Sequence, residues 1–438
     1  MAEVQKRQLR FERFGLESIP QELQQTRWYE YSFIQATFSV NAGNFLVPAL
    51  AVLQGHLSIL AAVLSTTIGA AVAFLLVSYL SLPGARYGIP AQYAMRSFLG
   101  VKGAQWISSP IRTITSLYWF SVQTVGGSYV IQKMLLSYFH VHVPFTMLAI
   151  ILSTIMAILA LIGFEAVKKV TKQFFPLLLI GQVVILWLFI RSLQASSISL
   201  THGAHECSFS TCLFYASLAF IQYISGVTSS SDITRYAKTG THGFWGLYVG
   251  NVLGFMMTAV LATLGAGLFQ NENPFIATST LTTSSVVVGL MVICSMISMI
   301  SINLSNAYTG GLSLLNSLPA LGRIKAAILF GLLGIALSTL PQLVSEAKTY
   351  ISMLGAFVVP LSAVIVAEFL WINKRTLIPI QTKNINKLAI GHALIGALIY
   401  FFVPDQYSPG FTLFVLTFIS YGLTKRFVSG KARDLSPL

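Results

Sequence analysis

The sequence predicts an all-α polytopic membrane protein with about twelve transmembrane helices, and three observations support this class. Hydrophobic residues make up 55% of the 438 residues and charged residues only 9%, whereas an ordinary soluble domain carries about 25% charged residues. Long uncharged runs divide the chain, and Lys and Arg gather between alternate runs. The composition excludes disorder and argues against a soluble enzyme, because too little polar surface remains to face water.

Twelve apolar runs are the expected spans, since a helix needs about 20 apolar residues to cross a bilayer. In order they cover residues 33–53, 57–80, 114–131, 143–164, 174–190, 213–231, 244–269, 286–307, 326–340, 350–370, 388–403 and 411–423. The runs 326–340, 388–403 and 411–423 are short for a span.

The net charge of +14 is explained by topology. With the amino terminus inside, all of the 27 Lys and Arg except Lys133, Arg191 and Lys348 fall on the inner side, as the positive-inside rule requires. We therefore expect a multi-pass protein of the cell membrane with both termini cytoplasmic. The lipid bilayer, rather than a nucleic acid, is the surface that the basic charge faces, and no obligate protein partner is evident.

Two of the runs are interrupted by residues that disfavour a helix. The first contains Ser39-Val40-Asn41-Ala42-Gly43-Asn44, and the sixth contains Ser225-Gly226-Val227-Thr228-Ser229-Ser230-Ser231. Paired interruptions at matching positions of two halves are typical of a transporter binding site, where unwound backbone receives the substrate. Asn41, Asn44 and Gly226 are candidate contacts there. Small-residue helix packing is the alternative explanation.

The third run carries Trp119 and Gln123, which are four residues apart and so share a helix face. An indole stacks on a flat ligand, and an amide offers both a donor and an acceptor. The pair suits a planar heterocycle with an amide edge. A packed Trp, with the Gln bonded to a neighbouring helix, is the alternative.

The sixth and eighth runs supply further candidates. Phe220, Tyr223 and Ser225 come just before the second interruption, and Tyr223 is placed to cover the other face of the same ring. The eighth run is unusually polar, and its oxygens suit a small cation or a substrate edge; interhelical hydrogen bonding is the alternative. Its polar residues are Ser298, Ser301, Asn303, Ser305 and Asn306.

Catalytic chemistry has no visible apparatus in this sequence. Asp232 and Glu368 lie near inner boundaries with Lys or Arg nearby, which favours solvated ion pairs. No nucleotide-binding loop, zinc-ligand pair or nucleophile elbow is present, so we expect no enzyme and no cofactor. Cys207 and Cys212 are either a small outer disulfide or two thiols.

Several motifs resemble the nucleobase:cation symporter family, which includes cytosine permease, hydantoin permease and fungal purine-cytosine permeases. They are Phe14-Gly15-Leu16-Glu17-Ser18-Ile19-Pro20, Gly88-Ile89-Pro90 with Arg96-Ser97-Phe98-Leu99-Gly100-Val101-Lys102-Gly103, Trp119-Phe120-Ser121-Val122-Gln123, Ser231-Asp232-Ile233-Thr234-Arg235-Tyr236, and Pro360 with Glu368. The likeness runs from about residue 13 to residue 370.

This resemblance implies a leucine-transporter-type fold of two inverted five-helix repeats plus two peripheral helices. The expected domains are a cytoplasmic amino-terminal segment (1–30), a ten-helix transport core (31–373), two peripheral transmembrane helices (374–425) and a cytoplasmic tail (426–438). The family's sodium-using members place adjacent hydroxyls on helix eight. Here Ser301 is followed by Ile302, so a co-transported proton is favoured over sodium.

The expected function is import of a small planar nitrogen heterocycle, such as cytosine or a purine, coupled to a cation by alternating access. Trp119 and Tyr223 would stack on the ring, while Gln123, Ser225 and Asn306 would bond its edge. Ser298 and Ser301 are the candidate ion residues. The alternatives are a carrier of hydantoin, allantoin, a vitamin or an amino acid on the same fold, and then a channel or a receptor.

Overall fold

A computed structural model describes residues 14–161, 164–201, 208–377 and 384–434, with side chains outside 164–172 and 429–434. Within these residues the chain is helical throughout, apart from turns, loops and one isolated bridge between Thr26 and Ala237. The all-α prediction is therefore confirmed. The alternatives for Cys207 and Cys212, a disulfide or two thiols, involve residue 207, which lies outside the described residues.

The first half of the core supplies the helices of the first five predicted runs and the short helices between the second and third. The spans are α1 (Trp28–Ser39) with α2 (Ala42–Leu53), α3 (Ile59–Leu80), α7 (Ser109–Phe139), α8 (Phe145–Ala160) and α9 (Phe164–Gln194); the short helices are α4 (Leu82–Tyr87), α5 (Ala91–Leu99) and α6 (Val101–Gly103).

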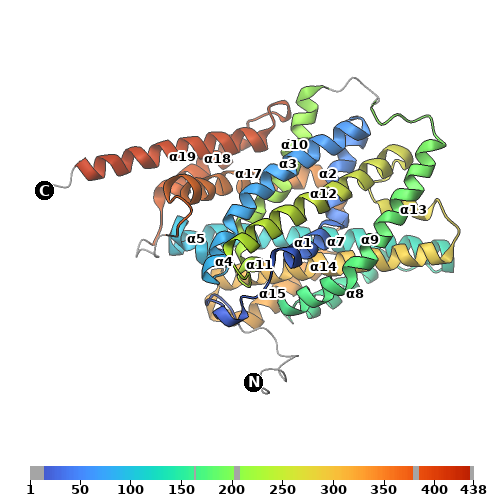
Figure 1. The fold of residues 1–438 in the computed structure, drawn as a ribbon, viewed down its shortest axis with the longest axis horizontal. Coiled ribbons are helices and arrows are strands. Elements are labelled where there is room, and N and C mark those ends of the chain that lie inside the picture. The colour runs from blue at the N-terminus through green and yellow to red at the C-terminus, as the bar shows by residue number, and fades with distance from the viewer. Residues whose placement is uncertain (1–13, 162–163, 202–207, 378–383, 435–438) are drawn as a thin grey trace, which may run out of the picture.

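The second half repeats this plan, and two helices follow it. They are α10 (Phe209–Ile224), α11 (Ser230–Thr234), α12 (Gly240–Phe269), α13 (Pro274–Ser279), α14 (Ser285–Ser317), α15 (Gly322–Leu337), α16 (Gln342–Ser345) and α17 (Ala347–Val366), then α18 (Lys387–Tyr400) and α19 (Pro409–Asp434). The last two lie along one side of the bundle, against α17 (Figure 1).

The twelve predicted runs correspond to α1–α2, α3, α7, α8, α9, α10, α12, α14, α15, α17, α18 and α19. Among the described residues, 8 helices are long and apolar enough to span a membrane, and the bent pair α1–α2 brings the total to 9. Helices α8 and α18 are shorter apolar helices. Helix α7 has 31 residues, but its Ser, Thr and Gln residues lower its hydropathy.

The packing of the helices obeys the symmetry of two inverted repeats. If the second half repeats the first, α1 corresponds to α10 and α3 to α12. Helix α1 packs on α12, and its counterpart α10 packs on α3. The pairs α7 with α14 and α8 with α15 each join a helix to its own counterpart. Helices α2 and α10 also contact each other, so the two interrupted helices lie side by side, as is typical of an inverted-repeat transporter.

A stripe of small residues allows α1 to approach α12 closely. A Cβ added at Gly246, Gly250 or Gly254 would lie 2.5, 2.6 and 2.7 Å from atoms of α1. These glycines are four residues apart and so face the same side of α12. Close backbone approach of this kind drives helix association where no hydrophobic effect operates between helices.

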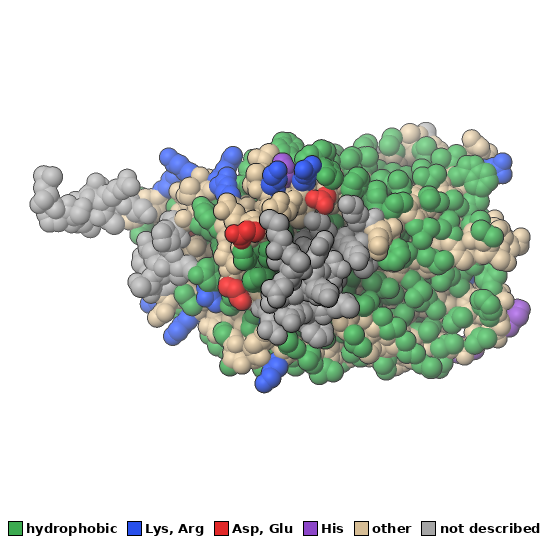
Figure 2. Space-filling model, turned by 60° about the horizontal axis from the view of Figure 1, so that its bottom comes forward, with side chains coloured by type: hydrophobic (Ala, Val, Ile, Leu, Met, Phe, Trp, Pro, Cys, Tyr) green, Lys and Arg blue, Asp and Glu red, His purple; other side chains and the backbone are tan. Residues whose placement is uncertain are grey.

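The surface separates charged and apolar regions. Figure 2 shows Lys and Arg side chains gathered toward one end of the molecule, with a broad apolar surface over the remainder. At the charged end, the amino-terminal segment is fixed to the core. Arg235, which is 0% exposed, donates from Nη1 to the Gly15 carbonyl at 3.0 Å and from Nη2 to the Tyr308 hydroxyl at 2.6 Å. Thr26 pairs with the backbone of Tyr236 and Lys238.

Candidate substrate site

The first interruption is a bend between two capped helices. Helix α1 ends at Ser39, α2 begins at Ala42, and their axes differ by 60°. Asn41 is the N-cap of α2, and its Oδ1 accepts from the Asn44 backbone N–H at 2.8 Å. Asn44 in turn donates from Nδ2 to the Ser39 carbonyl at 2.9 Å. The Asn residues that disfavour a continuous helix therefore supply the bonds that replace it.

Gln123 of α7 completes this bend. Its Nε2 donates to Asn41 Oδ1 at 2.6 Å, and its Oε1 accepts from the Gly43 N–H at 3.1 Å. A Cβ on Gly43 would lie 2.5 Å from Gln123 Nε2 and 3.2 Å from the Trp119 ring. Only glycine allows α7 to come this close. The Gln123 amide, which the sequence suggested for the substrate edge, is thus engaged at both ends by α2.

The second interruption is longer. Helix α10 ends at Ile224, a 3-10 turn covers Ser225–Thr228, and α11 begins at Ser230. Carbonyls released from the helix are met from neighbouring elements: Gln92 Nε2 donates to Thr228 at 3.0 Å, and Ser362 Oγ donates to Ile224 at 3.3 Å. Arg112 Nη1 lies 3.4 Å from the Ser225 carbonyl.

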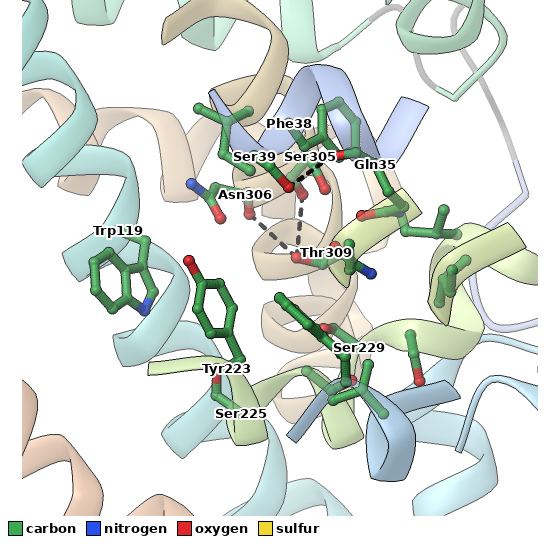
Figure 3. Close-up of a pocket in the computed structure, with 18 of the residues that line it drawn as sticks. Gln35, Phe38, Ser39, Trp119, Tyr223, Ser225, Ser229, Ser305, Asn306 and Thr309 are labelled. Carbon is green, nitrogen blue, oxygen red and sulfur yellow. Dashed lines mark hydrogen bonds between the residues drawn. The ribbon is translucent and has the colours of Figure 1, made fainter. Parts of the chain in front are cut away.

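A cavity of about 150 Å³ lies between the two interruptions. Figure 3 shows α1 above it, α7 with Trp119 on one side, the second interruption below, and α14 behind with Ser305, Asn306 and Thr309. The predicted site residues that line the cavity are Asn44, Trp119, Gln123, Tyr223, Ser225, Gly226 and Asn306.

Two predicted residues do not line this cavity. Asn41 is 0% exposed because its side chain caps α2. Phe220 is 1% exposed, and its ring lies 5.1 Å from Phe411 and 5.2 Å from Phe414 of α19. These contacts with α19 show that Phe220 faces the peripheral helix and not the cavity, although it stands only three residues before Tyr223 on the same helix.

The two candidate stacking residues differ in their surroundings. Trp119 is half-buried and meets Tyr118 edge to face at 4.9 Å. The Tyr223 ring packs against Phe74 at 4.5 Å and Phe255 at 5.1 Å, while its buried hydroxyl has no hydrogen-bond partner among the described residues. Figure 3 shows the rings of Trp119 and Tyr223 on the same side of the cavity.

The candidate ion residues lie beside the first interruption. Ser298 donates from Oγ to the Val40 carbonyl, in the bend between α1 and α2. Ser301 is 0% exposed, and its Oγ is without a partner in the described part of the chain. Ile302 lines the substrate cavity.

Sequence reasoning missed several lining residues, of which Arg112 and Gln222 are the most informative. Arg112 was counted only as a cytoplasmic charge. Gln222 donates from Nε2 to the Gly43 carbonyl at 3.1 Å and to Asn44 Oδ1 at 3.2 Å, so it links the two interruptions. The available signal was a glutamine between Phe220 and Tyr223 in an apolar helix. The other missed lining residues include Gln35, Asn251, Ser229, Ser230 and Thr309.

The two inner carboxylates are buried rather than solvated, which corrects the sequence-based expectation. Glu368, 4% exposed, pairs with Lys425 at 3.1 Å and accepts from the Tyr421 hydroxyl. Asp232, 0% exposed, accepts from the Ala91 N–H at 2.7 Å but forms no ion pair with the described residues. The α5 amino terminus satisfies one oxygen of Asp232, and its Oδ2 has no partner in that part of the chain.

A second cavity of about 570 Å³ lies toward the opposite end of α7. Tyr129 and Lys133 of α7 and Glu272 of the α12–α13 loop are among its lining residues. Burial raises the pKa of Glu272 above its usual range. The two cavities share no lining residue.

Comparison with known proteins gives a consistent result. A family model described as "Permease for cytosine/purines, uracil, thiamine, allantoin" matches residues 18–379. The allantoin permease of Bacillus subtilis (strain 168) is 24% identical over 354 residues, which cover 72% of this chain and 72% of that protein.

Solved transporter structures share the architecture. Mhp1, a nucleobase-cation-symport-1 family transporter in a closed conformation with bromovinylhydantoin bound, matches with a TM-score of 0.77 at 16% identity over 92% of this chain and 93% of its own. Its inward-facing conformation gives a TM-score of 0.76 at 16% identity over 96% of both chains. A Na+-coupled sialic acid symporter gives 0.67 at 13% identity, covering 96% of this chain and 93% of that chain. These likenesses confirm the predicted leucine-transporter-type fold.

Proposed function

Since the chain belongs to the family of permeases for cytosine/purines, uracil, thiamine and allantoin, we propose that it imports a small planar nitrogen heterocycle by cation-coupled alternating access. The family membership makes the chain a membrane transporter and not an enzyme. Nucleobases, hydantoins and allantoin all present a flat amide-bearing ring, and they form the substrate class of this proposal.

Trp119 carries the proposal, because it exposes an indole to a cavity that lies between two interrupted helices. Stacking of a ring on this indole would contribute about 1–3 kcal/mol. Tyr223 would contact the ring from the second interruption, with Ser225 and Asn306 bonding its edge. Gln123 has a different role here: it holds the α1–α2 bend, and Gln222 supports the same bend from α10.

A proton is the favoured coupling ion. A sodium site beside the α1–α2 bend would need carbonyl and hydroxyl oxygens free to coordinate. The Val40 carbonyl there accepts from Ser298, and Ile302 offers no oxygen where the family's sodium users carry a hydroxyl. The orientation with both termini inside follows from the distribution of Lys and Arg.

Uptake of radiolabelled rings by purified protein in proteoliposomes tests the function. A panel of cytosine, adenine, uracil, hydantoin and allantoin, each with an imposed pH or sodium gradient, identifies the ring and the ion. Trp119→Ala is expected to lower uptake of the true substrate at least tenfold, from the loss of one stacking face, and Trp119→Phe is expected to retain part of it. Unchanged uptake in Trp119→Ala would contradict the proposal, and competition by amino acids but not by rings would favour an amino-acid carrier.

A further inference from the structure

Arg112 is the one formally charged side chain among the described residues that line the substrate cavity. It stands seven residues before Trp119 on α7, about two helical turns, so both side chains project from nearly the same face. At 1.5 Å per residue the two positions are about 10 Å apart along the helix axis. Only 7% of Arg112 is exposed.

The guanidinium has few partners for its charge. It donates from Nη2 to Thr309 Oγ1 at 3.0 Å and from Nη1 to the Ser225 carbonyl at 3.4 Å, and both acceptors are neutral. A guanidinium carries five N–H donors, and Nε has no acceptor among the described residues. Arg112 forms no ion pair with any residue that the structure describes.

Asp232 is the carboxylate that acts on Arg112 through space, but it does not neutralise it. Asp232 interacts electrostatically with Arg235 and Arg323 as well as with Arg112, and one of its oxygens accepts a hydrogen bond from the Ala91 N–H. A buried positive charge without a close counter-ion is costly in the membrane interior, and such residues mark substrate or ion pathways.

We propose that the transported ring bears a carboxylate, and that Arg112 receives this group while the ring lies at Trp119; this rests on the function proposed above. A guanidinium binds a carboxylate through two parallel N–H donors, which no neutral edge can match. The unpartnered hydroxyls of Tyr223 and Ser230 also line the cavity, and both are donors that an anion accepts. The carboxylate would stand on the ring or on a short arm, on the side of the ring that faces Arg112.

A rival explanation assigns Arg112 a purely structural role, as a brace between α7, the Ser225 carbonyl and Thr309 of α14. The two explanations differ in what they predict for pairs of ligands that share a ring and differ only in the carboxylate. A brace affects both members of a pair equally, and a ligand-binding arginine affects only the acid.

The two explanations of Arg112 are separated by measuring how matched pairs of ligands bind to the purified full chain, by ligand-induced thermal shift. The pairs are uracil with uracil-6-carboxylate, and hydantoin with hydantoin-5-acetate. In the unaltered protein the acid of at least one pair is expected to bind at least about tenfold more tightly than its neutral partner. Arg112→Gln is expected to remove this preference by weakening binding of the acid at least tenfold more than binding of its neutral partner, and Arg112→Lys is expected to keep part of the preference. Arg86→Gln is the matched control, because Arg86 is exposed and lies outside the cavity.

Equal or tighter binding of the neutral members by the unaltered protein would overturn the proposal, and so would an equal loss for both members in Arg112→Gln. If Arg112→Gln does not fold, the proposal is judged by whether the unaltered protein prefers the acid to its neutral partner and whether Arg112→Lys keeps part of that preference. Benzoate, an aromatic acid without ring nitrogen, distinguishes the two proposals. Binding of benzoate that Arg112→Gln abolishes, with no binding of either heterocycle, supports the anion site and overturns the heterocycle assignment. Binding of the neutral rings alone supports the heterocycle assignment and overturns the anion site.

Discussion

The two interrupted helices look alike in sequence but differ in how their polar groups are satisfied. At the α1–α2 bend, the side chains of Asn41, Asn44 and Gln123 all bond to one another or to the backbone. At the α10–α11 interruption, the Tyr223 hydroxyl, the Ser230 hydroxyl and Arg112 Nε have no partner in the described part of the chain.

We propose that this difference separates a structural joint from a binding surface. Unsatisfied polar groups are costly in a membrane interior, so backbone leaves the helix only where other groups replace its bonds. At the first bend, Gln123 of α7 and Gln222 of α10 supply hydrogen-bond partners for the interrupted backbone. At the second interruption, a ligand in the cavity would supply partners for the polar groups that have none. A cluster of Gly, Ser and Asn in a span therefore indicates an interruption, and the neighbouring helices decide its role.

The largest expected effect comes from removing the α7 contribution to the first bend. Gln123→Leu keeps the side-chain volume but leaves the Gly43 N–H unpaired and Asn41 Oδ1 short of one donor. We expect the free energy of unfolding to fall by about 2–5 kcal/mol and uptake to be lost. Thermal unfolding in detergent measures the loss of stability. Gln182→Leu is the control, because buried Gln182 Oε1 on α9 has no partner among the described residues; equal stability of the two variants would refute the comparison.

Gly43→Ala tests the same bend from the backbone side. The new methyl would lie 2.5 Å from Gln123 Nε2, so Gln123 or α2 must shift. Overpacking of this kind costs about 1–3 kcal/mol, and the neighbouring Trp119 ring would move with it, which lowers substrate affinity. Gly289→Ala is the matched control, since its methyl would meet nothing within 4 Å. Unfolding and uptake of both variants are compared, and a Gly43→Ala protein that behaves like Gly289→Ala would show that the bend is not tightly packed.

Tyr223→Phe tests the second interruption and is expected to separate stability from binding. Removing a buried hydroxyl without a partner leaves stability unchanged or slightly raised, whereas a substrate that bonds this hydroxyl loses about 1 kcal/mol, or about fivefold in affinity. Ligand titration and thermal unfolding of the same preparation provide both values. Lower stability with unchanged affinity would place Tyr223 among the structural residues instead.

The smallest effect on substrate binding is expected at Phe220. Its ring packs on α19 and not on the cavity, so Phe220→Leu is expected to cost less than about 1.5 kcal/mol of stability and to leave the order of competing substrates unchanged. Competition uptake across the ring panel measures this order. A changed order would indicate that α10 turns during transport and exposes Phe220.

The sequence was sufficient for the apolar helices, the two interruptions and two of the four aromatic residues that line the cavity, because each depends on local composition or helical spacing. Tyr223 and Trp119 were found in this way. The other two, Phe38 and Phe74, were not predicted. The partner of Gln123 was not predictable, since its bonds depend on how closely α7 approaches Gly43. Arg112 was assigned to topology because hydropathy does not distinguish a cytoplasmic arginine from one enclosed by other helices. The predicted run 114–131 lies within α7, which extends beyond it at both ends, from Ser109 to Phe139.

The attachment of the amino-terminal segment has a consequence for how this end of the molecule moves. Arg235 follows α11 directly, and its buried guanidinium donates hydrogen bonds to the carbonyls of Phe14 and Gly15. Any displacement of α11 must carry this stretch with it or break both bonds. We therefore expect the residues before the first span to restrain the movement of α11 during transport. Trimming the chain past Gly15 should alter turnover before it alters ligand affinity.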